Sequence, residues 1–124
     1  MKKYLFFDTE TTGLPPNFKI PRHFFNYWPR LVQLSWIFTD EKGNHIKEAD
    51  HIIKPEGFTI PIDASDIHGI TTSMAFEKGD DLASVIDEFL IDFKAADELK
   101  AGMPTTFRCG KRAFKLSFGL RCIG

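Results

Sequence analysis

The spacing of apolar and polar positions predicts three strands in the first half of the chain. Residues 4–7 form a continuous aromatic and aliphatic run, which is typical of a buried central strand. Residues 31–38 alternate, with Gln33 and Ser35 on one face, so we expect a second strand packed mainly on the other face. A turn at 40–44 then leads into a third strand over 45–54, and these two strands form an antiparallel hairpin. The packed face of the second strand consists of Val32, Leu34, Trp36 and Phe38.

Two helices are predicted in the second half. Residues 62–70 contain a short helical turn that Gly69 closes as a C-cap. The longer helix has apolar residues at i, i+3, i+4, i+7, i+8 and i+11, a spacing that gathers them into one stripe. Asp80 or Asp81 can cap its N-terminus by accepting hydrogen bonds from backbone N–H groups. The stripe consists of Leu82, Val85, Ile86, Phe89, Leu90 and Phe93.

The order of these elements is that of an α/β domain, and a chain of 124 residues can form one core. We expect a parallel strand after the long helix, beside the first strand and reached by a right-handed crossover. Residues 95–99 begin where that strand should start, but the apolar residues that would continue it are missing.

Composition adds a sharp change of charge near residue 99. Residues 1–99 hold all 17 acidic residues with ten Lys and Arg, for a net charge of −7, whereas residues 100–124 hold six Lys and Arg and no acid. Both cysteines, Cys109 and Cys122, fall in this basic segment, and their spacing matches no zinc motif. No apolar run approaches the roughly 20 residues of a membrane span. The N-terminus also lacks a signal peptide's apolar core, so we expect a cytoplasmic protein without membrane contact.

Asp8 and Glu10 stand at the end of the first apolar run. Because side chains alternate along a strand, the two carboxylates point the same way, one pleat apart. Oxygen ligands of this kind suit hard divalent cations, and two ions about 3.5–4 Å apart can activate a water and stabilise the leaving oxygen of a phosphodiester. Gly13 and the neighbouring threonines allow the backbone to approach a bound nucleotide. A plain polar strand end is the alternative interpretation of this pair.

Residues 6–14, Phe-Phe-Asp-Thr-Glu-Thr-Thr-Gly-Leu, resemble the first motif of the DnaQ-like, or DEDD-type, 3′–5′ exonucleases. This family includes the proofreading subunit of bacterial DNA polymerase III and belongs to the ribonuclease-H-like superfamily. The similarity continues through 28–34 and 67–71 and fades after about Glu98. It implies a ribonuclease-H-like mixed sheet with flanking helices, incomplete at the C-terminus.

The resemblance also assigns roles to individual residues. It makes Asp8 and Glu10 the catalytic residues and the ligands of Mg²⁺ or Mn²⁺. It places Thr11, Thr12, Gly13 and Leu14 against the 3′-terminal nucleotide. His68 has a substrate-side or turn-stabilising role, because it comes too early to be the family's late general base.

The later motifs of the family are missing, because no Asp, Glu or His follows Glu98. We therefore expect residues 1–98 to be the N-terminal part of an exonuclease domain and 99–124 to be an atypical basic tail. Two explanations stay open for that tail, an out-of-frame or truncated continuation and a natural segment that binds phosphate. Since the ligands of such a site act as a unit, we expect little or no nuclease activity from this polypeptide alone.

Other functions remain open on the sequence alone. A non-catalytic nucleic-acid-binding or interaction module on the same fold is the main alternative, whereas Glu10 and the acid-free tail disfavour an aspartyl-phosphate phosphatase. Residues 15–30 mix aromatic and basic residues, a composition that suits single-stranded nucleic acid or a packed contact. The expected partner is single-stranded or 3′-terminal nucleic acid, with DNA favoured over RNA. A polymerase or helicase partner and self-association through exposed apolar surface stay open.

Overall fold

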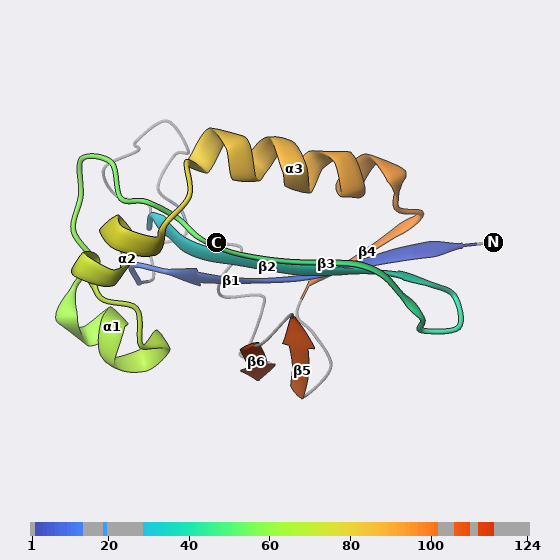
Figure 1. Ribbon diagram of the computed structural model, residues 1–124, viewed down its shortest axis with the longest axis horizontal. Coiled ribbons are helices and arrows are strands. Elements are labelled where there is room, and N and C mark those ends of the chain that lie inside the picture. The colour runs from blue at the N-terminus through green and yellow to red at the C-terminus, as the bar shows by residue number, and fades with distance from the viewer. Residues whose placement is uncertain (1, 14–18, 20–28, 102–105, 110–111, 116–124) are drawn as a thin grey trace.

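A four-stranded mixed sheet forms the body of the protein (Figure 1). The computed structural model describes residues 2–13, 19, 29–101, 106–109 and 112–115. The strand order is β3-β2-β1-β4, with β1 over Lys3–Thr11, β2 over Leu31–Asp40, β3 over His45–Ile52 and β4 over Glu98–Ala101. β1 pairs antiparallel with β2, and β2 pairs antiparallel with β3. The predicted central strand and the predicted hairpin are therefore confirmed.

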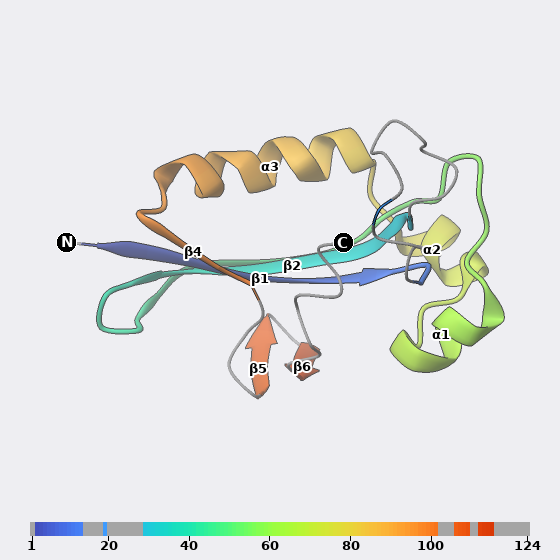
Figure 2. The same ribbon diagram turned by 180° about the vertical axis from the view of Figure 1, so that it is seen from behind.

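β4 is the parallel strand expected after the long helix. It lies beside β1, with Tyr4 opposite Glu98 and Phe7 opposite Ala101. A short two-stranded sheet, β5 over Thr106–Cys109 and β6 over Arg112–Lys115, follows in the chain. Figures 1 and 2 place it on the face of the main sheet opposite the long helix, where β5 lies against β2 and β3.

The turn between β2 and β3 is organised by one carboxylate. Asp40 accepts hydrogen bonds from the backbone N–H groups of Lys42 and Asn44 at 2.9 and 3.0 Å, and from the Asn44 side-chain amide at 3.0 Å. The hydrogen bonds from Asn44 lower the pKa of Asp40, because they favour its charged form. The turn predicted at 40–44 therefore follows from local side-chain chemistry.

Three helices follow the hairpin, α1 over Ile62–His68, α2 over Thr72–Lys78 and α3 over Leu82–Ala95. Gly69 ends α1 in the left-handed conformation, with φ of 78°, as predicted. Asp81 caps α3 by accepting from the N–H of Ser84 at 3.0 Å, which decides between the two capping candidates. α2 was not predicted from the sequence, and it begins where the Thr71 side chain accepts a hydrogen bond from the N–H of Met74 at 3.2 Å.

The core has two parts. One lies between α3 and the sheet, where Val85 packs with Leu5 and Trp36, and the ring of Phe89 meets those of Phe7 and Trp36 edge-on. The other lies at the end of the sheet beside α1 and α2 (Figure 2). Its buried members are Val32, Ile52, Ile60, Ala64, Ile70 and Ala75.

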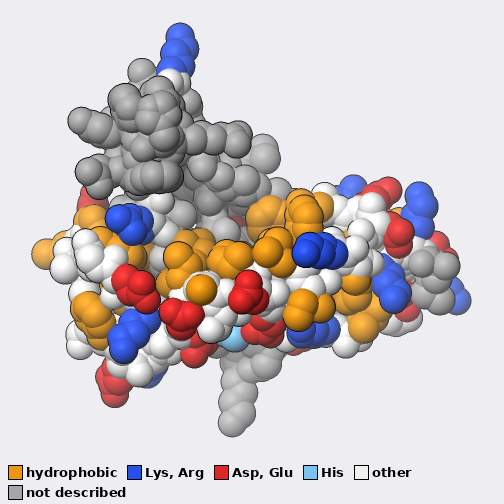
Figure 3. All heavy atoms as spheres, turned by 90° about the horizontal axis from the view of Figure 1, so that it is seen from above, with side chains coloured by type: hydrophobic (Ala, Val, Ile, Leu, Met, Phe, Trp, Pro, Cys, Tyr) orange, Lys and Arg blue, Asp and Glu red, His pale blue; other side chains and the backbone are white. Residues whose placement is uncertain are grey.

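One detail of the predicted packing is wrong. β2 is buried on both faces rather than on one, because Gln33 and Ser35 are also inaccessible, at 6% and 2% exposed. The apolar stripe of α3 is only partly buried, because Leu82, Leu90 and Phe93 remain 36–42% exposed. Figure 3 shows hydrophobic side chains along the outer surface of α3. Among the described residues, none of the helices combines the length and the apolar character that a membrane crossing requires.

Candidate functional site

Asp8 and Glu10 lie on the face of the sheet opposite α3. The pairing of β1 with β2 is regular from Lys3 to Glu10, so residues two apart share a face. Leu5 and Phe7 pack towards α3, and the alternate positions 8 and 10 therefore face the other way. Asp8 is 8% exposed and accepts a hydrogen bond from the N–H of Thr9 at 3.0 Å. Two carboxylates thus lie one pleat apart, close to the end of β1.

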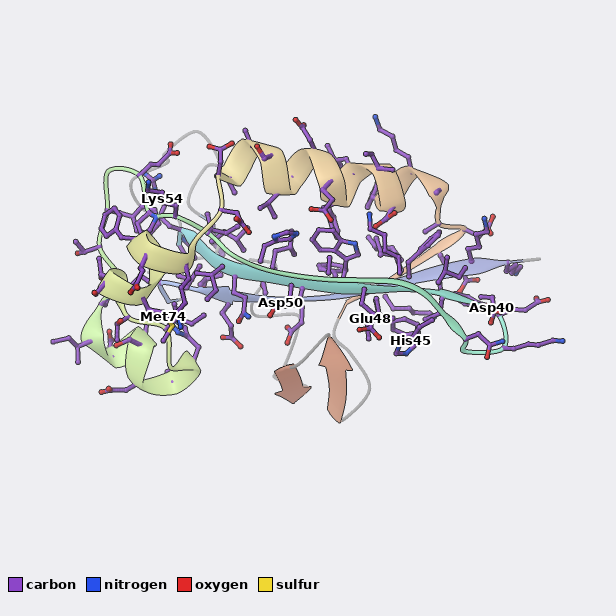
Figure 4. The ribbon with its side chains drawn as sticks, in the orientation of Figure 1. Asp40, His45, Glu48, Asp50, Lys54 and Met74 are labelled. Carbon is purple, nitrogen blue, oxygen red and sulfur yellow. The ribbon has the colours of Figure 1, made fainter. Side chains whose placement is uncertain are left out.

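A polar cluster continues this face across β2 and β3. Ser35 lies opposite Asp8, Gln33 lies opposite Glu10, and Asp50 lies opposite Ser35 on the next strand. The Gln33 amide and the Ser35 hydroxyl both donate to Oδ1 of Asp50, at 2.7 and 2.8 Å. Figure 4 shows Asp50 on the side of the sheet away from α3. Asp50 therefore fixes the two polar residues that adjoin the carboxylate pair.

The turn after β1 is closed by its threonines. The Thr11 hydroxyl donates to the carbonyl of Gly13 at 2.8 Å and accepts from the Gly13 N–H at 3.3 Å. Gly13 has φ of 147°, a conformation that residues with a side chain rarely adopt. The Thr12 N–H donates to the carbonyl of Arg30 at 3.0 Å, and the Arg30 N–H donates to Thr12 Oγ1 at 2.9 Å. Both ends of this turn are therefore fixed.

His68, the last residue of α1, lies beside the backbone of Thr11. Its Nδ1 accepts from the N–H of Ile70 at 3.1 Å, which places the ring proton of the neutral form on Nε2. Nε2 is buried and makes no hydrogen bond of good geometry to any described residue. Burial lowers the pKa of His68 from 6.5, and the nearby Thr11 backbone opposes this shift more weakly. His68 therefore favours the neutral form at the end of β1.

The donor set on this face suits a hard divalent cation, because it consists of carboxylate oxygens. Asp8 and Glu10 are the residues that could hold one. Within the described part of the chain, no group of three or more Asp, Glu, His or Cys side chains is arranged to hold a metal ion. The carboxylate pair therefore fits as part of a ligand set.

The structure brings most of the predicted site residues together. Asp8 and Glu10 lead directly into the turn of Thr11, Thr12 and Gly13, and His68 contacts that turn from α1. Leu14 and most of residues 15–30 lie outside the described residues. Sequence reasoning did not identify Asp50, because its partners are set by strand register. It also gave no individual role to Arg30, which is paired with Thr12 across the turn.

The chain matches the RNase T family model, whose description is "Exonuclease", over residues 5–119. The match extends past Glu98, where we placed the end of the resemblance, and the division of the chain at 98/99 stays a prediction. No curated protein sequence matches the chain.

Solved structures of exonuclease I are similar to this chain. E. coli exonuclease I in complex with a dT13 oligonucleotide aligns with a TM-score of 0.63 and 25% identity. Exonuclease I from Methylocaldum szegediense aligns with a TM-score of 0.64 and 25% identity. Another similar structure is a complex described as ExoI/SSB-Ct, at 25% identity and a TM-score of 0.63. Each alignment covers 80% of this chain and 20% of the solved chain, so this chain spans about a fifth of their length.

These comparisons confirm the expected fold class. The mixed four-stranded sheet with its helices is ribonuclease-H-like and resembles exonuclease I. The roles of individual site residues stay predictions, as do the identity of a metal ion and the cytoplasmic location.

Proposed function

Because the chain belongs to the RNase T family of exonucleases, we propose that it is a 3′–5′ exonuclease domain for single-stranded DNA. The observation that carries this proposal is the pair Asp8 and Glu10, on one face of β1 beside the Thr11–Gly13 turn. The structures of E. coli exonuclease I with dT13 and dA16 oligonucleotides support DNA as the substrate class. A polymerase or helicase partner and a cytoplasmic location remain part of the proposal.

Asp8 and Glu10 would hold Mg²⁺ or Mn²⁺ through their carboxylate oxygens. A divalent cation bound there would supply activation of water and charge stabilisation at the scissile phosphate. The protein's own contribution is to fix both carboxylates on a regular strand, with Ser35 and Gln33 held beside them by Asp50. Carboxylates on a strand are positioned more accurately than carboxylates on a loop.

The Thr11–Gly13 turn would receive the 3′-terminal nucleotide. Its backbone is fixed by Thr11 and by the pairing of Thr12 with Arg30, so little ordering is needed when the nucleotide binds. A Cβ added at position 13 would lie within 4 Å of no atom of the described residues other than its chain neighbours. His68 supports this turn from α1.

We propose that this polypeptide alone has little or no nuclease activity. The resemblance to DEDD-type exonucleases implies a set of four carboxylates, of which Asp8 and Glu10 are two, and no acidic residue follows Glu98. Removing members of a catalytic set costs nearly as much as removing the whole set, because they act together. Binding of metal and of the 3′ end would survive this loss better than turnover.

A non-catalytic nucleic-acid-binding module is the second candidate. It is favoured by one observation, that the described residues contain no cluster of three metal-ligating side chains. Such a module needs neither a free 3′ end nor a divalent cation. An exonuclease domain needs both, so the two functions make different predictions for binding.

The test compares a linear single-stranded oligonucleotide with a circular one of the same sequence. Binding is measured by fluorescence anisotropy with and without Mn²⁺, for the wild type, Asp8→Ala and the exposed control Asp87→Ala. We expect tighter binding to the linear strand in Mn²⁺, with the difference lost in Asp8→Ala and kept in Asp87→Ala. Equal affinity for the two strands would refute the exonuclease function. Robust shortening of the linear strand would refute only the proposed lack of activity.

A further inference from the structure

Arg30 immediately precedes β2 and stands beside the turn that ends β1. Its backbone N–H and carbonyl are both paired with Thr12, at 2.9 and 3.0 Å. Its side chain is exposed. The positively charged side chain of Arg30 therefore extends from a fixed backbone position, directly across from the turn that follows Asp8 and Glu10.

Phe58 supports the guanidinium group of Arg30. Cζ of Arg30 lies 5.3 Å from the centroid of the Phe58 ring, within the range of a cation–π contact. Phe58 itself packs against the buried cluster beside α1 and α2, and this packing restricts the position of its ring. The planar guanidinium carries five N–H donors, and that fork matches two phosphate oxygens.

The negative charge near the turn favours a role for the Arg30 side chain in binding phosphate. Without a bound cation, Asp8 and Glu10 repel a phosphodiester strand that approaches β1. Contacts from Arg and Lys to phosphates position a nucleic acid without reading its sequence. Arg30, whose backbone is fixed beside the turn, can supply such a contact.

We propose that Arg30 binds a backbone phosphate of the single-stranded DNA that enters the Thr11–Gly13 turn. The inference rests on the proposed function and adds a positioning contact outside the carboxylate pair. Arg30 holds one phosphodiester through its guanidinium, while Phe58 keeps the guanidinium in place. The contact is independent of base identity.

The salt dependence of binding tests this contact. Each phosphate that a cation neutralises on a single strand contributes about −0.7 to the slope of log K against log salt. Arg30→Gln should therefore make the slope shallower by about 0.7, so that the loss in affinity grows about fivefold for each tenfold dilution of salt. The measurement is anisotropy of a labelled oligo-dT in Ca²⁺, at several sodium chloride concentrations.

Two further variants separate the contact from general charge and from folding. Lys42→Gln removes the same charge next to Asp40, in the β2–β3 turn at the far end of the sheet from α1 and α2 (Figure 4), and should leave the slope unchanged. Arg30→Lys keeps the charge and should recover most of the slope.

The outcomes distinguish this inference from the proposed function. A wild-type slope in Arg30→Gln, or an equal loss in Lys42→Gln, would refute the role of Arg30 while DNA binding stands. A wild-type protein that binds no oligo-dT would refute the proposed function and this inference together. Because Ca²⁺ replaces the catalytic ions, turnover does not enter the result.

Discussion

Among the polar residues that the structure describes, Asp92 on α3 is the one whose substitution should lower the free energy of unfolding most. It is 5% exposed, and its Oδ2 accepts from Nε1 of the fully buried Trp36 at 2.8 Å. The same oxygen lies 3.1 Å from Nζ of Lys47 on β3. One carboxylate thus joins the helix to two strands of the sheet.

The expected loss for Asp92→Ala follows from these contacts. The substitution leaves the buried indole N–H of Trp36 without its acceptor, and a buried donor without a partner costs about 1–3 kcal/mol. The Lys47 contact adds less than about 1 kcal/mol, because that side chain is 39% exposed and its charge is screened by water. We therefore expect a loss of about 2–3 kcal/mol in the free energy of unfolding. Asp92→Asn keeps an acceptor for Trp36 and should lose about 1 kcal/mol.

Urea denaturation followed by circular dichroism measures this difference. Asp87→Ala is the matched control, because it makes the same change of helix propensity at an exposed position of α3. For a slope near 1.5 kcal/mol per molar urea, the midpoint of Asp92→Ala should fall by about 1–2 M relative to this control. A difference of less than about 0.5 kcal/mol between the two variants would refute the reasoning, because the Trp36 donor would then be satisfied elsewhere.

Two other substitutions test the packing and the electrostatics. Gly79→Ala should destabilise by about 3 kcal/mol or more, because its Cβ would lie 2.6 Å from the backbone nitrogen of Lys54 and would also clash with the backbone carbonyl oxygen of Ala75. Gly43→Ala meets no neighbouring atom and should cost only about 1–2 kcal/mol for its φ of 84°, so equal losses in thermal unfolding would contradict this explanation. The lowered pKa of His68 means that the unfolded chain takes up its proton first as the pH falls below about 6.5. The stability that neutral His68 contributes is therefore full above that pH and declines below it. In urea titrations, the wild type should lose more stability than His68→Asn between pH 7.5 and 5.5. Equal losses in the two proteins would exclude a contribution of His68 to this pH dependence.

Local sequence was sufficient for several elements of the fold. The position of β1 follows from its apolar run, although the strand continues past this run to Thr11, and α3 follows from its helical period and its Asp81 cap. α1 follows from the Gly69 C-cap. The structure also contains the parallel β4, whose place could be predicted although its apolar pattern is weak.

Other features depend on contacts between distant residues. Asp50 meets Gln33 and Ser35 only through the register of β2 with β3, at separations of 17 and 15 residues. Asp92 meets Trp36 across 56 residues, and helical periodicity treats Asp92 as a solvent-facing position. These pairs arise from tertiary packing, which a pattern along one segment does not contain.

The partners of His51 also depend on tertiary packing. The spacing of His51 along the chain does not identify its partners. In the structure, its Nδ1 lies 2.8 Å from Asp80 and its Nε2 lies 2.8 Å from Glu88, while its ring stands against Trp36. Its partners come from the residue before the cap of α3 and from the body of that helix, so only the packing of α3 on β3 brings them together.

The most direct test of the central claim is a Mn²⁺ titration of the purified chain by electron paramagnetic resonance. Asp8→Ala and Glu10→Ala are compared with the wild type and with Asp87→Ala, which removes one carboxylate from the opposite face. We predict that the wild type and Asp87→Ala bind Mn²⁺ with equal affinity, and that each site variant binds at least about tenfold more weakly. Equal binding by all four proteins would show that Asp8 and Glu10 are not the metal ligands, and would contradict the proposed exonuclease site.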